Sequence, residues 1–355
     1  MTMSKLFTSL AIKSVTLKNR IVISPMCQYS AEDGFANDWH LIHLGSRAVG
    51  GAGLIIQEAT AVSPEGRITL SDLGLWKDEQ AEKLKSIVSF VHTQGSLIGI
   101  QLAHAGRKAS HALPWKGGKQ LTLQDGGWQA VAPSAIPFLD GTQAPSELSV
   151  DGIKKVIDDF KKATVRTVEI GYDVLEIHSA HGYLLHEFLS PLTNQRNDSY
   201  GGSFENRIRL LLEILKGVQE FWPEHKPLFV RISASDWAEG GWNIDESVRL
   251  AKILKQQGVD VIDCSSGGAV AHQKIKLGPG YQVLFAERIK KEVGILTGAV
   301  GMITTVEQAE EILASEKADL ILIARESLRN PYFPLQAARQ LNEDITWPDQ
   351  YLRAK

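Results

Sequence analysis

The chain has 355 residues, of which 43% are hydrophobic and 22% are charged, and its formal net charge is -3. This composition is typical of a globular protein, and the absence of excess positive charge argues against nucleic acid or an anionic membrane surface as a partner. No apolar run approaches the roughly 18 residues that a membrane span needs. Two cysteines, Cys27 and Cys264, are too few for a disulfide framework, so we expect an unexported, cytoplasmic protein.

Short runs rich in β-branched residues alternate with longer amphipathic segments along the chain. The short runs predict eight strands, at residues 20–24, 54–58, 97–101, 174–178, 228–232, 261–264, 295–297 and 320–323. The longer segments predict helices that include residues 78–93, 150–169, 204–221, 245–257 and 305–314. Strands that alternate with crossover helices form a parallel sheet, so eight such units predict an α/β fold, a (β/α)8 TIM barrel, in one domain over residues 1–355.

Two segments are too long to be plain connections between barrel elements. Residues 109–145 follow the third strand and are rich in Gly, Pro and Trp, so we expect them to form a lid beside the barrel mouth. Residues 189–207 lead into a helix that Ser203 is expected to cap. Active sites of TIM barrels lie at the C-terminal ends of the strands, so polar residues that follow each run are the candidate functional residues.

The first strand is followed by the sequence SPMCQY, which places the thiol of Cys27 and the phenol of Tyr29 at the barrel mouth. A thiol at this position could approach a redox-active ring, although an isolated cysteine is more often a small buried hydrophobic residue. The third strand ends in Gln101, whose amide can both donate to and accept from a planar heterocycle.

The fourth strand ends in the sequence EIHSAHGY, which brings His178, His181 and Tyr183 to the mouth. Two imidazoles can donate hydrogen bonds to one carbonyl oxygen, and a nearby phenol can deliver a proton to a carbon that gains negative charge. A zinc site is an alternative for the pair of histidines, but it needs a further ligand from elsewhere. Hydrogen-bonded core histidines are a second alternative, and we interpret His40 and His43 in that way.

Arg231 lies within an apolar strand, where an unpaired charge would be costly to bury. We therefore expect it to face an anion or an electron-rich ring, such as the N1 and O2 edge of a flavin. An internal salt bridge to Glu58 or Glu176 is the alternative.

The loops after the last two strands indicate a phosphate site. The sequence TGAVG ends in Gly301 after the seventh strand, and Ala324 and Arg325 follow the eighth. TIM barrels often bind phosphate with these two loops, through backbone amides and a helix N-terminus. Arg325 would add a bidentate partner.

Taken together, these segments resemble the old yellow enzyme family of FMN-dependent ene-reductases, especially its bacterial branch of xenobiotic reductases and thermophilic-like enzymes. The resemblance covers nearly the whole chain. It rests on the motifs SPMC at 24–27, QLAHAGRK at 101–108, HSAHGY at 178–183, SPLTN at 190–194 with Arg196, YGG at 200–202 and GAVG at 298–301.

The resemblance implies FMN as the cofactor and NADPH or NADH as the reductant. It implies FMN contacts from Ser24, Pro25, Met26, Cys27, Ala59, Gln101, Arg231, Gly301, Ala324 and Arg325. His178 and His181 are implied to hold a substrate carbonyl oxygen, Tyr183 to donate a proton, and Tyr29 to contact the substrate, with Cys27 tuning the flavin and touching the substrate. No metal is expected.

The implied reaction is the ping-pong reduction of an electrophilic alkene, such as an enone, by hydride from N5 of reduced FMN. The C-terminal segment, residues 346–355, is implied to reach a neighbouring subunit of a homodimer or homotetramer, where Arg353 would contact the substrate.

Three other functions are open from the sequence. A dienoyl-CoA reductase has a similar barrel but also an iron–sulfur cluster, for which two separated cysteines are too few. A flavin-binding redox protein could reduce other acceptors, such as quinones, nitro compounds or nitrate esters, or could act without turnover as a redox sensor or store. A noncatalytic barrel is the third possibility.

Overall fold

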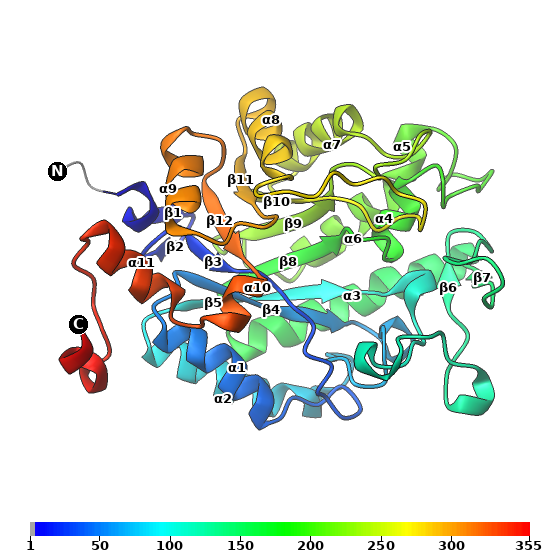
Figure 1. Cartoon of the computed structure of the whole chain (residues 1–355). Coiled ribbons are helices and arrows are strands. Elements are labelled where there is room, and N and C mark those ends of the chain that lie inside the picture. The colour runs from blue at the N-terminus through cyan, green and yellow to red at the C-terminus, as the bar shows by residue number, and fades with distance from the viewer. Residues whose placement is uncertain (1–3) are drawn as a thin grey trace.

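The computed structural model describes residues 4–355, and its central feature is a closed barrel of eight parallel strands (Figure 1). In chain order the strands are β3 (Ile21–Ile23), β4 (Leu54–Ala61), β5 (Leu97–Ala103), β8 (Val174–Ser179), β9 (Leu228–Ser233), β10 (Val261–Ser265), β11 (Leu296–Ala299) and β12 (Leu320–Ile323). All eight predicted strands are present, and pairing of β12 with β3 closes the ring. The predicted (β/α)8 TIM barrel is confirmed.

Helices cover the outside of the barrel (Figure 1). They are α1 (Asp38–Val49), α2 (Ala81–Thr93), α3 (Val150–Ile170), α4 (Leu184–Leu189), α5 (Phe204–Arg207), α6 (Arg209–Gln219), α7 (Ile244–Gln256), α8 (Val283–Val293), α9 (Val306–Ala314), α10 (Arg325–Arg329) and α11 (Phe333–Leu341). The helix predicted over residues 204–221 is divided at Ile208 into α5 and α6. Ser203 caps it as predicted, because its side chain accepts a hydrogen bond from the backbone N–H of Asn206.

Two small sheets lie outside the barrel. The antiparallel hairpin of β1 (Leu10–Ile12) and β2 (Val15–Leu17) precedes the first barrel strand, and the parallel pair of β6 (Val131–Ala132) and β7 (Ser146–Glu147) follows β5. Short 3-10 turns complete the structure: η1 (Lys5–Phe7), η2 (Pro64–Gly66), η3 (Asp78–Gln80), η4 (Gly106–Lys108), η5 (Pro114–Lys116), η6 (Leu123–Asp125) and η7 (Asp349–Ala354).

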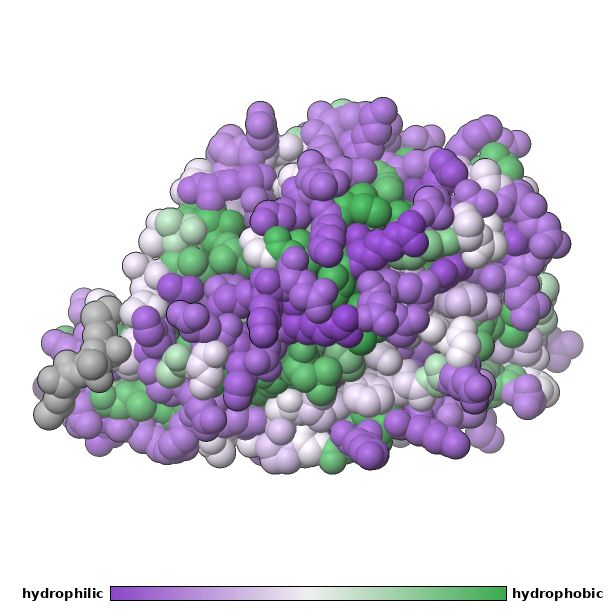
Figure 2. Space-filling view, turned by 90° about the horizontal axis from the view of Figure 1, so that it is seen from above, coloured by the Kyte–Doolittle hydropathy of each residue, from purple (hydrophilic) through white to green (hydrophobic). Residues whose placement is uncertain are grey.

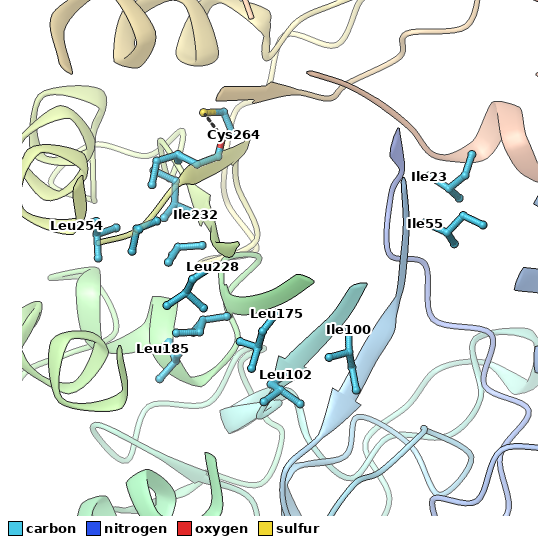
Figure 3. Close-up of a cluster of buried hydrophobic side chains, with 14 of the residues drawn as sticks. Ile23, Ile55, Ile100, Leu102, Leu175, Leu185, Leu228, Ile232, Leu254 and Cys264 are labelled. Carbon is cyan, nitrogen blue, oxygen red and sulfur yellow. Dashed lines mark hydrogen bonds between the residues drawn. The ribbon is translucent and has the colours of Figure 1, made fainter. Parts of the chain in front are cut away.

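The barrel strands separate two apolar layers. Side chains on their outer face, such as Leu175 and Ile232, pack between the sheet and the surrounding helices, where they meet Leu185 of α4 and Leu254 of α7 (Figure 3). A smaller cluster fills the barrel interior. It consists mainly of Ile12, Leu17, Val22, Leu54, Ile56, Val174, Phe229, Val261, Val300, Leu320 and Leu322.

Side chains alternate between the two faces of each strand, and those that face the barrel interior become polar toward the C-terminal ends of the strands. In β8 the interior residue Val174 is followed on the same face by Glu176 and His178, and in β9 Phe229 is followed by Arg231. The hairpin residue Leu17 belongs to the interior cluster at the other end. The polar end is therefore the end at which a TIM barrel places its chemistry.

The face of the molecule seen from above is mostly hydrophilic. Polar side chains dominate the face seen from above, with smaller hydrophobic areas between them (Figure 2). None of the helices that residues 4–355 form is long and apolar enough to span a membrane. The hairpin of β1 and β2 and the C-terminus lie on one side of the barrel, whereas β6 and β7 lie on the other (Figure 1).

His43 on α1 makes the stability of this fold sensitive to acid. Burial, together with nearby Arg47 and His40, lowers the pKa of His43 from 6.5 to about 3. Below pH 6.5 the unfolded chain therefore binds a proton that the folded chain excludes, and folding is destabilised as the pH falls. We expect His43→Leu to reduce the loss of unfolding free energy between pH 7 and pH 5 by about 2 kcal/mol. Urea denaturation at both pH values measures this, and equal losses in the two proteins would contradict a buried neutral His43.

Candidate active site

The turn after β3 starts the site at the C-terminal end of the barrel. Ser24 is buried, and its Oγ has no hydrogen-bond partner within residues 4–355. Because Val22 faces the barrel interior, Ser24 two residues later points toward the same side. Pro25 and Met26 follow and are half-buried.

Cys27 and Tyr29 meet at the mouth, as predicted. The Cys27 thiol lies near the Tyr29 side chain and near Ala59 in β4. Burial, followed by the charges of two nearby carboxyl groups, raises the pKa of Cys27 well above its usual value, so this group is a thiol and not a thiolate. The ring of Trp115, from residues 109–145, lies 6.1 Å from the ring of Tyr29.

A layer of polar side chains crosses four neighbouring strands, from β5 to β10. Gln101 Nε2 donates a hydrogen bond to Glu176 Oε1 at 2.7 Å. Arg231 Nε lies 2.9 Å from Asp263 Oδ2. The alternative of an internal salt bridge for Arg231 is therefore present, but its partner is Asp263 and not Glu58 or Glu176, because the parallel register of β9 and β10 sets Asp263 directly beside Arg231.

His178, His181 and Tyr183, at the C-terminal end of the fourth barrel strand, lie close together. The ring of His178, in β8, lies 5.1 Å from the ring of His181 and 5.3 Å from the ring of Tyr183, with both pairs edge to face. His181 Nε2 lies 2.6 Å from Ser265 Oγ at the end of β10. Lys108 Nζ lies 5.6 Å from the centre of the Tyr183 ring.

Burial determines the protonation states in this cluster. Burial, reinforced by the charge of Arg231, lowers the pKa of His178 and His181 well below 6.5, so both imidazoles are neutral. Burial, with smaller contributions from Cys27 and a carboxyl group, raises the pKa of Tyr183, so its phenol stays protonated. A neutral imidazole retains one N–H donor. The cluster therefore combines two hydrogen-bond donors with one weak acid.

The loops after the last two strands, which are predicted to bind phosphate, line a cavity. Gly301, Ala324 and Arg325 line one cavity of about 280 Å³ beyond β11 and β12. Gly301 has a φ of 120°, and a Cβ there would lie 2.9 Å from the Gln282 side chain, so only glycine fits without rearrangement. Backbone amides and a guanidinium at such a place are suitable phosphate donors.

These groups match the chemistry of FMN, which joins a flat polar heterocycle to a phosphate. The buried, unpartnered Ser24 hydroxyl, the Gln101 amide and Arg231 lie on the strands at one end of the barrel, and the cavity at Gly301 offers the phosphate donors. Across the described part of the chain, no three His, Cys, Asp or Glu side chains are grouped to hold a metal ion. The pair of histidines therefore lacks the further ligand that zinc needs.

One residue of the site was not predicted from the sequence, and one predicted residue lies away from the others. Ser265, which holds His181, was missed, although it directly follows a predicted strand and the strand-end rule applies to it. Arg353 is exposed on η7, near the C-terminus, and the C-terminus lies on the opposite side of the barrel from β6 and β7 (Figure 1). Within its own chain, Arg353 is not brought together with the other predicted site residues.

Known proteins resemble the chain over nearly its whole length. Residues 5–344 match the family described as the NADH:flavin oxidoreductase / NADH oxidase family. The chain is 53% identical over 354 residues to a NADPH dehydrogenase of Listeria monocytogenes serotype 4a (strain HCC23), with 99% of each chain covered. It is 52% identical over 351 residues to a NADPH dehydrogenase of Bacillus subtilis (strain 168), with 98% of each covered.

Solved structures of known proteins are also similar to this chain. Morphinone reductase is similar with a TM-score of 0.79 and 29% identity, over 98% of this chain and 92% of that chain. The old yellow enzyme homologue from Zymomonas mobilis has a TM-score of 0.77 and 28% identity, over 96% and 94% of the two chains. The chain therefore belongs to the NADH:flavin oxidoreductase / NADH oxidase family, and it is an FMN-dependent NAD(P)H oxidoreductase of the old yellow enzyme type.

Proposed function

We propose that the protein reduces the activated carbon–carbon double bond of α,β-unsaturated carbonyl compounds and related electrophilic alkenes. The observation that carries this proposal is the convergence of neutral His178, neutral His181 and protonated Tyr183 at the end of β8. Donors that face a carbonyl oxygen draw electron density from the conjugated double bond, and an acid beside them can protonate the neighbouring carbon.

In this proposal, FMN is held by side chains and backbone groups in or just after six strands, which are β3, β4, β5, β9, β11 and β12. FMN, when bound, would supply the redox chemistry, which is ping-pong hydride transfer from NADPH or NADH to the β carbon of the alkene. Its ring and phosphate contacts are the residues that the family resemblance implies: Ser24, Pro25, Met26, Cys27, Ala59, Gln101, Arg231, Gly301, Ala324 and Arg325.

The remaining steps belong to the chain itself. His178 and His181 donate hydrogen bonds to the carbonyl oxygen, Tyr183 gives its proton to the α carbon, and Tyr29 contacts the substrate. Cys27 lines the same space as a thiol. Since the thiolate is the reactive nucleophile, the raised pKa of Cys27 protects the enzyme from alkylation by its own electrophilic substrates.

Residues 109–145 act as the lid of a single barrel domain in this proposal, because Trp115 reaches Tyr29 at the mouth. We further infer a homodimer or homotetramer. Large apolar side chains are exposed on α1, α10 and η7, among them Trp39, Ile42, Leu328 and Leu352, and exposed apolar area of this kind favours association. The two free cysteines suit the reducing cytoplasm.

In such an assembly the exposed Arg353 of one protomer contacts the substrate of its neighbour. We expect Arg353→Ala to raise the KM for 2-cyclohexenone by about tenfold, because a charged hydrogen bond contributes about 1.5–3 kcal/mol. The FMN content should not change. Lys355→Ala, which removes a tail cation paired with Asp344, is the control. Equal KM values for all three proteins would remove Arg353 from the site.

Product analysis tests the proposed function. The purified enzyme is incubated without oxygen with NADPH and 2-cyclohexenone, and cyclohexanone is quantified against the NADPH oxidised. One cyclohexanone per NADPH is expected. If none of several enones and enals yields a saturated product, while quinones or nitro compounds are reduced, the alkene proposal is wrong and the enzyme serves another acceptor.

A further inference from the structure

A completely buried pair of ionisable side chains lies behind the turn that carries His181 and Tyr183. His186 Nε2, on α4, lies 2.8 Å from Asp236 Oδ1, and neither side chain has any exposed surface. Since both are inaccessible, neither can touch a substrate. Burying such a pair carries a desolvation cost, so its value must lie in what it holds in place.

The hydrogen bonds identify which nitrogen of His186 carries the proton. The backbone N–H of Gly182 donates to His186 Nδ1 at 2.8 Å. Because a backbone amide can only donate, Nδ1 must be unprotonated and the proton must be on Nε2, the nitrogen that lies 2.8 Å from Asp236 Oδ1. Burial acts to raise the pKa of Asp236, but His186 and a hydrogen bond from the Ser190 hydroxyl hold it below its usual value. The ionised carboxylate thus selects this tautomer.

The turn that receives this hydrogen bond has an unusual backbone. His181 and Gly182 have φ values of 62° and 70°, and the left-handed region is costly for a residue with a side chain such as His181. The peptide group between them is held at both ends. Its oxygen accepts a hydrogen bond from Lys108 Nζ at 2.8 Å, and its N–H is the donor to His186.

We propose that His186 and Asp236 are positioning residues for the proton donor and the carbonyl clamp. By fixing the orientation of one peptide group, they set the Tyr183 hydroxyl on one side of it and the His181 ring on the other. This role rests on the proposed reduction of electrophilic alkenes. It extends the site to a second layer that links the end of β8 to the loop after β9.

The substitution Asp236→Asn tests the role without removing volume. The amide oxygen can keep the hydrogen bonds from Ser190 and from the Trp242 backbone, which directs the amide NH2 at His186 Nε2. The imidazole proton must then move to Nδ1, which can no longer accept from Gly182. Because small displacements of reacting groups can cost on the order of 10²-fold in rate, we expect a loss of that order in reoxidation of the reduced flavin by 2-cyclohexenone.

Reoxidation by oxygen provides the internal reference, since it requires neither a carbonyl clamp nor a proton from Tyr183. We expect Asp236→Asn to leave the oxygen rate unchanged. The matched control is Ser247→Ala, because the buried Ser247 accepts a hydrogen bond from Trp242 Nε1 at 2.7 Å next to Asp236. This control should lower the melting temperature but retain both rates. Equal loss of the enone rate in the two variants would assign Asp236 a merely structural role.

Nitrogen-15 NMR of the histidine rings in the holoenzyme tests the hydrogen bonds independently of turnover. We expect His186 to be neutral with the proton on Nε2 in the wild type, and to change tautomer in Asp236→Asn. A protonated Nδ1 in the wild type would overturn the positioning role. Failure of the wild type to reduce any enone, with the expected tautomer present, would instead reject the proposed function on which that role rests.

Discussion

Replacing Tyr183 by Phe is expected to slow reoxidation of the reduced flavin by 2-cyclohexenone by about 10²- to 10⁴-fold, the usual contribution of a positioned general acid. The ring would still fill its place beside His178, but the proton for the α carbon would have to come from elsewhere. Reduction of the flavin by NADPH needs no such proton and should keep its rate. Stopped-flow absorbance at the flavin band measures both half-reactions.

A second buried tyrosine supplies the control for this experiment. Tyr172 is buried away from the mouth, and its hydroxyl hydrogen-bonds Gln57. Tyr172→Phe should therefore affect stability but neither half-reaction. If Tyr183→Phe slowed both half-reactions equally, Tyr183 would not be the proton donor.

Replacing His178 or His181 by Ala is expected to lower the rate of enone reduction by about 10²- to 10³-fold, the range found when one donor to a developing negative charge is removed. Each neutral imidazole contributes one donor, and a methyl group contributes none. FMN should remain bound, because the proposed ring and phosphate contacts lie on other residues. Phenol binding should weaken in parallel, and the change that phenols cause in the flavin absorption spectrum measures this binding.

The histidine variants are interpreted against His43→Leu, which removes a buried histidine from α1 and should preserve turnover. Loss of yellow colour from the His178 or His181 variant would show that the residue binds the cofactor. An unchanged rate in both would mean that the substrate carbonyl is held by other groups.

Much of the fold followed from local patterns. The eight strands were predicted because buried parallel strands are short, continuous runs of β-branched residues. The Ser203 cap was predicted because a serine before a helix can accept a hydrogen bond from a free backbone N–H of the first turn. The pattern did not show that the helix at residues 204–221 is divided at Ile208. It also assigned no range to α1, whose apolar positions are interrupted by polar and small residues such as His43 and Ser46.

The site was predictable where a residue directly follows a strand. His178, His181 and Tyr183 were identified in this way, and the structure brings them together. The partners of buried charges were not predictable, because they depend on register between strands or on contacts between distant loops. Asp263 faces Arg231 only through strand pairing, and Asp236 lies 50 positions after His186 in the sequence.

A visible absorption spectrum of the purified protein, recorded without oxygen before and after addition of NADPH and then of 2-cyclohexenone, tests the central claim most directly. The protein is expected to be yellow, to bleach with one equivalent of NADPH, and to regain its colour with the enone. A protein that bleaches but stays colourless with every enone and enal offered would contradict alkene reduction as its activity.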